Sequence, residues 1–219
     1  MHIPDGFLNI STIAVTGAVS AVMVGYSLRA VGRKLKERQV PLMGVLAAFI
    51  FAAQMLNFPI AGGTSGHLIG AALAAILLGP WAAVLIMTCV LIIQAFVFQD
   101  GGLLALGANV LNMGIIASFA SYYIFRAVTL ILGSNRRGLL VGGFVAAWSS
   151  VFLASIACAI ELAVSGTSPL QVALPAMAGI HALIGIGEGL ITVAVLSFIL
   201  ATRADLLELA QRREVKHEA

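Results

Sequence analysis

The chain has 219 residues, of which 61% are hydrophobic and only 10% are charged, with a formal net charge of +3. An average soluble domain carries about 25% charged residues, so this chain has too few charges to cover a water-soluble globule. The composition therefore excludes a soluble protein and indicates an integral membrane protein that folds in the lipid bilayer. The basic residues lie in loops between apolar runs, a pattern that indicates membrane orientation and not binding to nucleic acid.

The N-terminus is expected to remain intact. The first apolar run, residues 7–31, is preceded by no basic residue, unlike the apolar core of a secretory signal peptide. Removal of the initiator methionine generally requires a small second residue, and His2 is large. We therefore expect Met1 to be retained, with a free amine once it is deformylated.

Long apolar segments follow one another along the whole chain. A transmembrane helix needs about 20 apolar residues. We therefore predict an all-α integral membrane protein, in which residues 1–219 form a single domain that is a bundle of seven transmembrane helices. The predicted helices cover residues 7–31, 41–58, 67–79, 80–98, 103–132, 139–165 and 179–201.

The orientation of this bundle follows from the basic residues, because Lys and Arg mark the cytoplasmic side. They cluster after the first, fifth and seventh segments. If the seven segments cross the membrane alternately, all three clusters lie on the same side. The N-terminus and the loop 59–66 are then predicted to lie outside, and the tail 202–219 is predicted to be cytoplasmic. The three clusters are Arg29, Arg33, Lys34, Lys36 and Arg38; Arg126, Arg136 and Arg137; and Arg203, Arg212, Arg213 and Lys216.

The third segment, residues 67–79, is short for a span. A helix of its length rises roughly 20 Å, whereas the hydrocarbon core is roughly 30 Å thick. The preceding residues 57–66 are rich in turn formers, and irregular backbone is tolerated at membrane depth only where protein walls it or it lines a polar cavity. We expect this loop to dip inward and to place His67, at the start of the helix, in a recess. The alternative is a longer, tilted pair of helices with a different boundary.

Polar side chains within the predicted spans fall mainly in their outer halves. Such residues are costly in a bilayer and usually face the bundle interior. Gln54 with Asn57, and Asn109 with Asn112, are spaced to share one helical face. One interpretation is scattered interhelical hydrogen bonds, each worth less than about 2 kcal/mol; the shared depth favours a site and its surroundings. The predicted supporting residues are Asp5, Gln54, Asn57, Gln94, Asn109, Asn112, His181 and Glu188, while Glu161 also lies in a predicted span.

The opening residues carry chemistry that an internal segment lacks. The free amine of Met1, with a pKa near 8, can chelate one metal ion together with the amide nitrogen and Nδ1 of His2. Three nitrogens then lie in one plane, and His67, on the same outer side, is the natural fourth ligand. Tetragonal nitrogen coordination favours Ni(II) or Cu(II) over Zn(II). Pro4 turns the chain back toward the bundle, and Asp5 is placed to cap the first helix or to accept from the terminal segment.

The string Met-His-Ile-Pro-Asp-Gly-Phe at the start, with Ser-Gly-His67 before a short helix, resembles the CbiM/NikM family. Members are the substrate-binding membrane components of energy-coupling-factor importers for nickel and cobalt in bacterial and archaeal cell membranes. The resemblance covers the whole chain and implies that the Met1 amine, the His2 amide and imidazole, and His67 bind the metal. Ni(II) or Co(II) is then the transported substrate, and no further cofactor is implied. Pro4 and Asp5 look more like nickel members, which favours nickel, with cobalt uptake for cobalamin synthesis as the alternative.

The resemblance also implies partners, namely a coupling transmembrane subunit, two cytoplasmic ATPases and a small accessory membrane protein. The sequence contains no G-x-x-x-x-G-K-[ST] motif, so ATP hydrolysis is expected on separate subunits and not on this chain. A remote alternative is an intramembrane metalloenzyme that uses His67, His181 and Glu188, but no H-E-x-x-H spacing supports it. A purely structural membrane protein would leave the terminal string unexplained.

Overall fold

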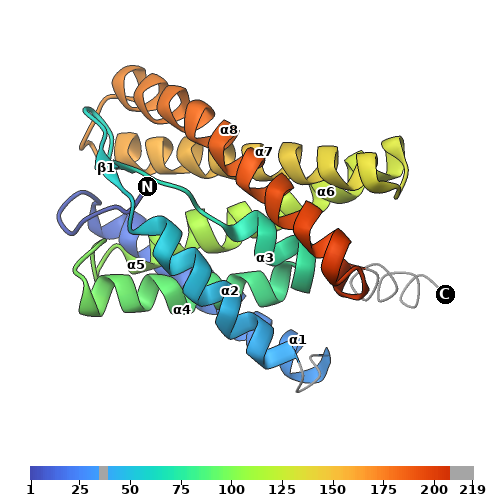
Figure 1. Cartoon of the computed structure of the whole chain (residues 1–219). Helices are drawn as coiled ribbons and strands as arrows, with labels where there is room; N and C mark the ends of the chain where they lie inside the picture. The colour runs from blue at the N-terminus through green and yellow to red at the C-terminus, as the bar shows by residue number, and fades with distance from the viewer. Residues whose placement is uncertain (35–38, 208–219) are drawn as a thin grey trace.

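The computed structural model describes residues 1–34 and 39–207, and most of them are helical (Figure 1). A two-stranded hairpin interrupts the helices after residue 54, and the continuous helix from Leu106 to Leu132 includes a stretch of π-helix. The elements are α1 (Ile10–Lys34), α2 (Val40–Gln54), β1 (Phe58–Pro59), β2 (Ser65–Gly66), α3 (Ala71–Leu78), α4 (Pro80–Val97), α5 (Leu106–Asn109), η2 (Val110–Ile116), α6 (Ala117–Leu132), α7 (Arg136–Val164) and α8 (Leu170–Thr202).

Each of the seven predicted segments contains helical residues, but the boundaries differ, and the last helix begins at Leu170, nine residues before its predicted start. In the described part of the chain, five helices have the length and apolar composition of a membrane span, namely α1, α4, the continuous helix 106–132, α7 and α8. The two others are shorter, because α2 has 15 residues and α3 has 8. The protein is therefore a multi-pass helical membrane protein with two helices shorter than a full span.

The segment between α2 and α3 differs from the prediction. Helix α2 ends at Gln54, so Asn57 lies beyond the helix and does not share a helical face with Gln54. A short antiparallel hairpin follows, in which Phe58 pairs with Gly66. Helix α3 begins only at Ala71, so His67 lies in the irregular connection before it and not at a helix start. Pro59, which lacks an N–H and fixes φ, and several glycines explain why no helix forms here.

Helix α3 lies in the centre of the bundle and is bounded by Gly70 and Gly79, both at positive φ. All eight of its residues are buried, and the longer helices α4, α6 and α7 pack around it. Helices α7 and α8 approach closely, since a Cβ at Gly185 or Gly189 would lie within 3 Å of Trp148 or Phe144. Small residues allow such close helix packing in membrane proteins.

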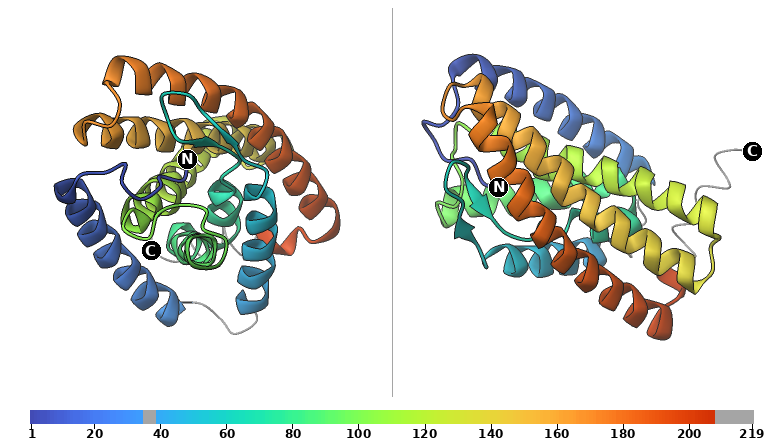
Figure 2. Two further views of the ribbon diagram at one scale, coloured as in Figure 1. Left: turned by 90° about the vertical axis from the view of Figure 1, so that its left-hand side faces the viewer. Right: turned by 90° about the horizontal axis from the view of Figure 1, so that it is seen from above.

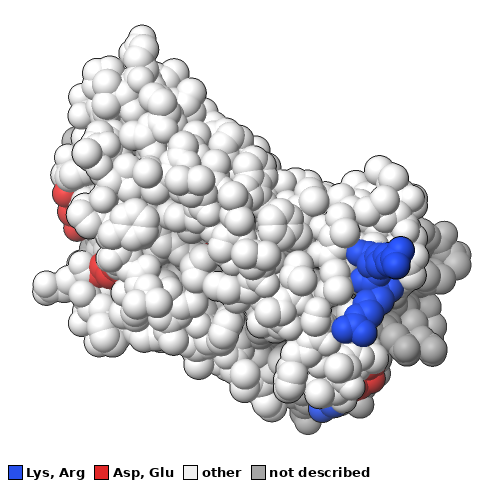
Figure 3. Space-filling model, turned by 45° about the horizontal axis from the view of Figure 1, so that its top comes forward, with Lys and Arg blue, Asp and Glu red and all other residues white. Residues whose placement is uncertain are grey.

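The loops and charges separate toward the two ends of the bundle. The N-terminus, the hairpin and the connection from α4 to α5 lie at one end, whereas α1, α6 and α8 finish at the other (Figures 1 and 2). On the face shown in Figure 3, Lys and Arg side chains gather toward one end of a surface that is otherwise largely uncharged. This separation is typical of a membrane protein that follows the positive-inside rule. Lys36, Arg38, Arg212, Arg213, Lys216 and most of the predicted tail 202–219 lie outside the described residues.

Candidate metal centre

The N-terminal segment folds into the bundle. Met1 and Ile3 are fully buried, and His2 is 4% exposed. Ile3 donates its N–H to Asn109 Oδ1 at 2.8 Å and accepts from Asn109 Nδ2 at 3.1 Å. Its carbonyl also accepts from the N–H of Gly102 at 2.8 Å. Asn109 therefore holds the main chain of the terminus in place, as a neighbouring strand would.

Asp5 fixes the other side of this segment. Its carboxylate accepts hydrogen bonds from the N–H groups of Leu103, Leu104 and Ala105 at 2.8 to 3.2 Å. These are unpaired donors at the start of the helix that begins at Leu106, where a negative charge is favourable. Asp5 thus caps that helix and not the first helix, and it ties the terminal segment to the loop before α5.

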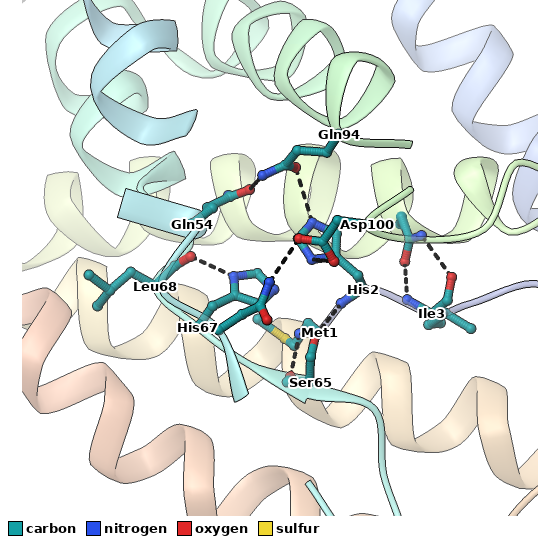
Figure 4. A network of polar contacts seen from close by, with 11 residues as sticks. Met1, His2, Ile3, Gln54, Ser65, His67, Leu68, Gln94 and Asp100 are labelled. Atoms are coloured by element: carbon teal, nitrogen blue, oxygen red, sulfur yellow. Dashed lines mark hydrogen bonds and ion pairs between the residues drawn. The ribbon is translucent and has the colours of Figure 1, made fainter. Parts of the chain in front are cut away.

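Ser65 brings the two main-chain nitrogens of the terminus together, as Figure 4 shows. The Met1 amine donates to the Ser65 carbonyl and, at 2.8 Å, to Ser65 Oγ; the His2 N–H donates to the same Oγ at 3.1 Å. Burial lowers the pKa of the Met1 amine from 8.0 to about 5. The docked amine is therefore neutral near pH 7 and has a free lone pair. We did not predict Ser65; its position two residues before His67 was its signal in the sequence.

A chain of two glutamine amides places a proton on one nitrogen of His2. Gln54 Nε2 donates to Ile69 O at 2.7 Å, Gln94 Nε2 donates to Gln54 Oε1 at 3.0 Å, and Gln94 Oε1 lies 3.1 Å from His2 Nε2. Because a carbonyl only accepts, Gln54 must present its amide N–H to Ile69 and its oxygen to Gln94. Gln94 then presents its oxygen to His2, so His2 Nε2 carries a proton and Nδ1 is the nitrogen that is left for a metal ion.

The same reasoning applies to the other two histidines. His67 Nδ1 lies 2.7 Å from the carbonyl of Leu68, and His181 Nδ1 lies 2.7 Å from that of Met177, so Nε2 is the lone-pair nitrogen in both. His67 Nε2 is buried and has no hydrogen-bond partner among the described residues. Burial, with the nearby N-terminal amine, lowers the pKa of His67 well below its usual value.

The rings of His2 and His67 stack, with centroids 4.4 Å apart and planes 17° from parallel. Buried polar atoms normally have partners, so the unpaired Nε2 of His67 beside His2 marks a site that suits a cation.

Glu188 and Gln54 hold the connection that carries His67. Glu188 accepts from the N–H of Ile69 at 2.5 Å through one oxygen and from that of Gly70 at 2.8 Å through the other. Gln54 holds the carbonyl of Ile69, as described above. Both oxygens of Glu188 are thus bonded to main chain, so this carboxylate positions the His67 segment from α8.

The remaining predicted residues divide between the site and a separate contact. Asn57 Nδ2 donates at 2.8 Å to Asp100 Oδ2, and Asp100 Oδ1 lies 3.1 Å from His2 Nδ1. Burial acts to raise the pKa of Asp100, but contact with His2 outweighs it and the pKa is lowered.

Asn112 instead donates to Glu161 at 2.6 Å. Asp100 was missed by sequence reasoning, because a loop carboxylate outside the spans carries no signal of its neighbours.

Side chains alone do not complete the site. Within residues 1–34 and 39–207, no three His, Cys, Asp or Glu side chains gather in an arrangement that could hold a metal ion. The nitrogens that converge here include the terminal amine and the His2 amide.

The fold and the site together define a membrane component of transition-metal uptake in the prokaryotic cell membrane. Residues 2–206 match the family described as the cobalt uptake substrate-specific transmembrane region, CbiM. The chain belongs to this family, whose members include nickel and cobalt transport proteins.

Relatives and solved structures of similar sequence cover nearly the whole chain. A protein of Archaeoglobus fulgidus, provisionally named the fused nickel transport protein NikMN, is 47% identical over 95% of this chain and 68% of its own length. The cobalt transport protein CbiM 2 of Pelobacter propionicus is 36% identical over 91% of each chain. A crystal structure of a truncated transition metal transporter superposes with a TM-score of 0.85 at 40% identity, over 92% of this chain and 99% of that one.

Proposed function

We propose that this chain is the substrate-binding component of an energy-coupling-factor importer that captures Ni(II) outside the cell and passes it inward. The observation that carries the proposal is that the Met1 amine and the His2 amide meet at Ser65 Oγ, while the ring of His67, with its unpaired Nε2, stacks on the ring of His2 in a buried site. With Nδ1 of His2, these groups supply four nitrogens. Ni(II) and Cu(II) are the divalent ions that tetragonal nitrogen coordination favours.

The chelate explains why the terminus has this sequence. The Met1 amine and the His2 amide close a five-membered ring on the metal, and the amide and Nδ1 close a six-membered ring. Ser65 Oγ holds the amide N–H in the structure, so metal binding must replace this hydrogen bond and release the amide proton. Metal binding is consequently coupled to proton release.

Nickel is favoured over cobalt as the substrate. The relative with 47% identity carries a nickel transport name, whereas the cobalt transport relative named above is 36% identical. Pro4 and Asp5 resemble nickel members of the family. Co(II) is the alternative, and competition between the two ions for the purified protein distinguishes them.

Release of the metal requires energy from partners. The proposed assembly contains a coupling transmembrane subunit, two cytoplasmic ATPases and a small accessory membrane protein. The N-terminal end of the bundle is proposed to face outside, because the basic helix ends lie opposite it (Figures 1 and 3). Incoming metal then meets the site directly.

An N-terminal extension tests the site. One extra methionine before Met1 keeps every native side chain and, because its neighbour is large, is expected to be retained. Tight Ni(II) binding, measured by competition with a chelator, should be lost together with the visible absorption of a planar complex. One extra residue at the C-terminus is the matched control and should bind as the native chain does. Unchanged binding by the N-terminally extended protein would refute the proposal.

A further inference from the structure

We infer that Asp100 supplies the negative charge of the metal centre. Its carboxylate is the first group that an entering divalent cation contacts, and it balances the charge of the ion bound by His2. This inference rests on the proposed function and adds to it a residue outside the four nitrogens. It assigns a binding role to the loop between α4 and α5.

Asp100 lies between the solvent and His2. Its Oδ1 is 3.1 Å from His2 Nδ1, and its side chain is 21% exposed, compared with 2% for that of His2. Asn57 Nδ2 donates to the other carboxylate oxygen at 2.8 Å and fixes the orientation of the side chain. A cation that approaches His2 from this side therefore contacts the carboxylate first.

The contact between Asp100 and His2 requires a positive charge. Gln94 Oε1 accepts from His2 Nε2, so Nδ1 faces the carboxylate either as the second N–H of an imidazolium, which forms an ion pair, or with a lone pair. In the second case two acceptors face each other, and a cation must lie beside both of them. A divalent cation at Nδ1 satisfies this arrangement, and it also satisfies the unpaired Nε2 of His67.

Charge counting leads to the same assignment. A divalent ion bound by a neutral amine, one deprotonated amide and two neutral imidazoles leaves a net charge of +1. Burying an unbalanced charge is costly, and the carboxylate of Asp100 brings the sum to zero. Asp5 and Glu188 are engaged by main-chain N–H groups, whereas Asp100 Oδ1 faces His2.

The loop is shaped to hold Asp100 there. Gln99 adopts φ +55, a left-handed conformation that is uncommon for a residue other than glycine. The next N–H, that of Asp100, donates to the carbonyl of Gln94 at 3.0 Å. The side-chain oxygen of Gln94 also accepts a hydrogen bond from His2 Nε2. A single residue of α4 thus positions the carboxylate on one side of the imidazole and the acceptor on the other.

The test uses the full chain with its native terminus and Ni(II) as the probe. Asp100→Asn keeps the shape and the bond from Asn57 but removes the charge. We expect its Ni(II) affinity to fall about tenfold or more at low ionic strength, with slower association and a weaker dependence of the association rate on salt. The planar absorption band should persist, because the four nitrogens are unchanged.

Asp100→Glu, which keeps the charge, should bind more tightly than Asp100→Asn, and Asn57→Ala should have the smaller effect of a loosened carboxylate. Native affinity and association rate in Asp100→Asn would overturn the inference and leave the proposed function intact. Loss of the planar band in that variant would also overturn it, since Asp100 would then be one of the four planar ligands. Absence of Ni(II) binding by the native chain would refute the proposed function and this inference together. If Asp100→Asn fails to fold, a salt-independent association rate in the native chain overturns the inference.

Discussion

Gly102 lies against Asp5 with no room for a side chain between them: a Cβ at Gly102 would lie 2.2 Å from Asp5 Oδ1 and 2.4 Å from the Asp5 main-chain nitrogen. The same glycine donates its N–H to Ile3. The terminal segment is therefore fitted to the loop before α5 by a contact that includes no proposed metal ligand. The position of the terminus depends on this contact.

Gly102→Ala is expected to displace the terminal segment and weaken Ni(II) binding. Overpacking of this kind costs about 1 to 3 kcal/mol, which corresponds to a loss of affinity of roughly 5- to 140-fold. Chelator competition on the purified protein measures it. Gly179→Ala, where an added Cβ meets nothing within 4 Å, is the control and should bind as the native chain does. Equal affinities in the two variants would show that the fit of loop and terminus does not control binding.

The glutamine chain predicts coupled effects. Gln94→Leu and Gln54→Leu should each lower Ni(II) affinity by roughly 10- to 100-fold, the usual cost of losing a group that orients a metal-binding histidine. Both side chains act through one series of hydrogen bonds from Ile69 to His2. The double variant should therefore lose about as much Ni(II) affinity as the single variant that loses more. A double-mutant cycle measures this. Losses that simply add would mean that the two amides act independently.

Replacing the two buried histidines should have unequal effects. His67→Ala removes a proposed ligand whose ring stacks on His2 and should abolish planar Ni(II) binding. His181→Ala removes a residue that we propose only as a support and should weaken binding less. Affinity and the visible absorption spectrum, compared in parallel, decide this. Equal losses would mean that the ligand set is assigned wrongly.

Binding should weaken as the pH falls. Burial lowers the pKa of the Met1 amine from 8.0 to about 5, so an undocked terminus binds a proton between these values while the docked one does not. Docking of the neutral amine is unopposed above pH 8 and is progressively opposed as the pH falls toward 5, by a factor of about ten per pH unit. Release of the His2 amide proton steepens the dependence. Ni(II) titrations across this range test the predicted pH dependence. A constant affinity between pH 8 and pH 6 would contradict it.

The fold was predictable where it depends on local composition. Each predicted apolar segment contains helical residues, and the described basic residues gather toward one end of the bundle. One error concerned a boundary, since α8 begins nine residues before its predicted start. The others arose where a polar pair was assigned to one helical face. Asn57 lies beyond the end of α2 and contacts Asp100. Asn109 binds Ile3, whereas Asn112, in the π-helix with its altered register, binds Glu161.

The sequence by itself determined the solvent of the fold, the apolar segments and the candidate nitrogens of Met1, His2 and His67. These are properties of single residues and of neighbours along the chain. Only the tertiary structure decided how those nitrogens are held and oriented. The hydrogen bonds of Gln54 and Gln94 orient His2, Ser65 binds the terminal amine, and the carboxylate of Asp100 lies against His2. Each of these contacts joins residues at least 15 positions apart. Their pairing depends on how the helices pack in three dimensions, and no local pattern encodes it.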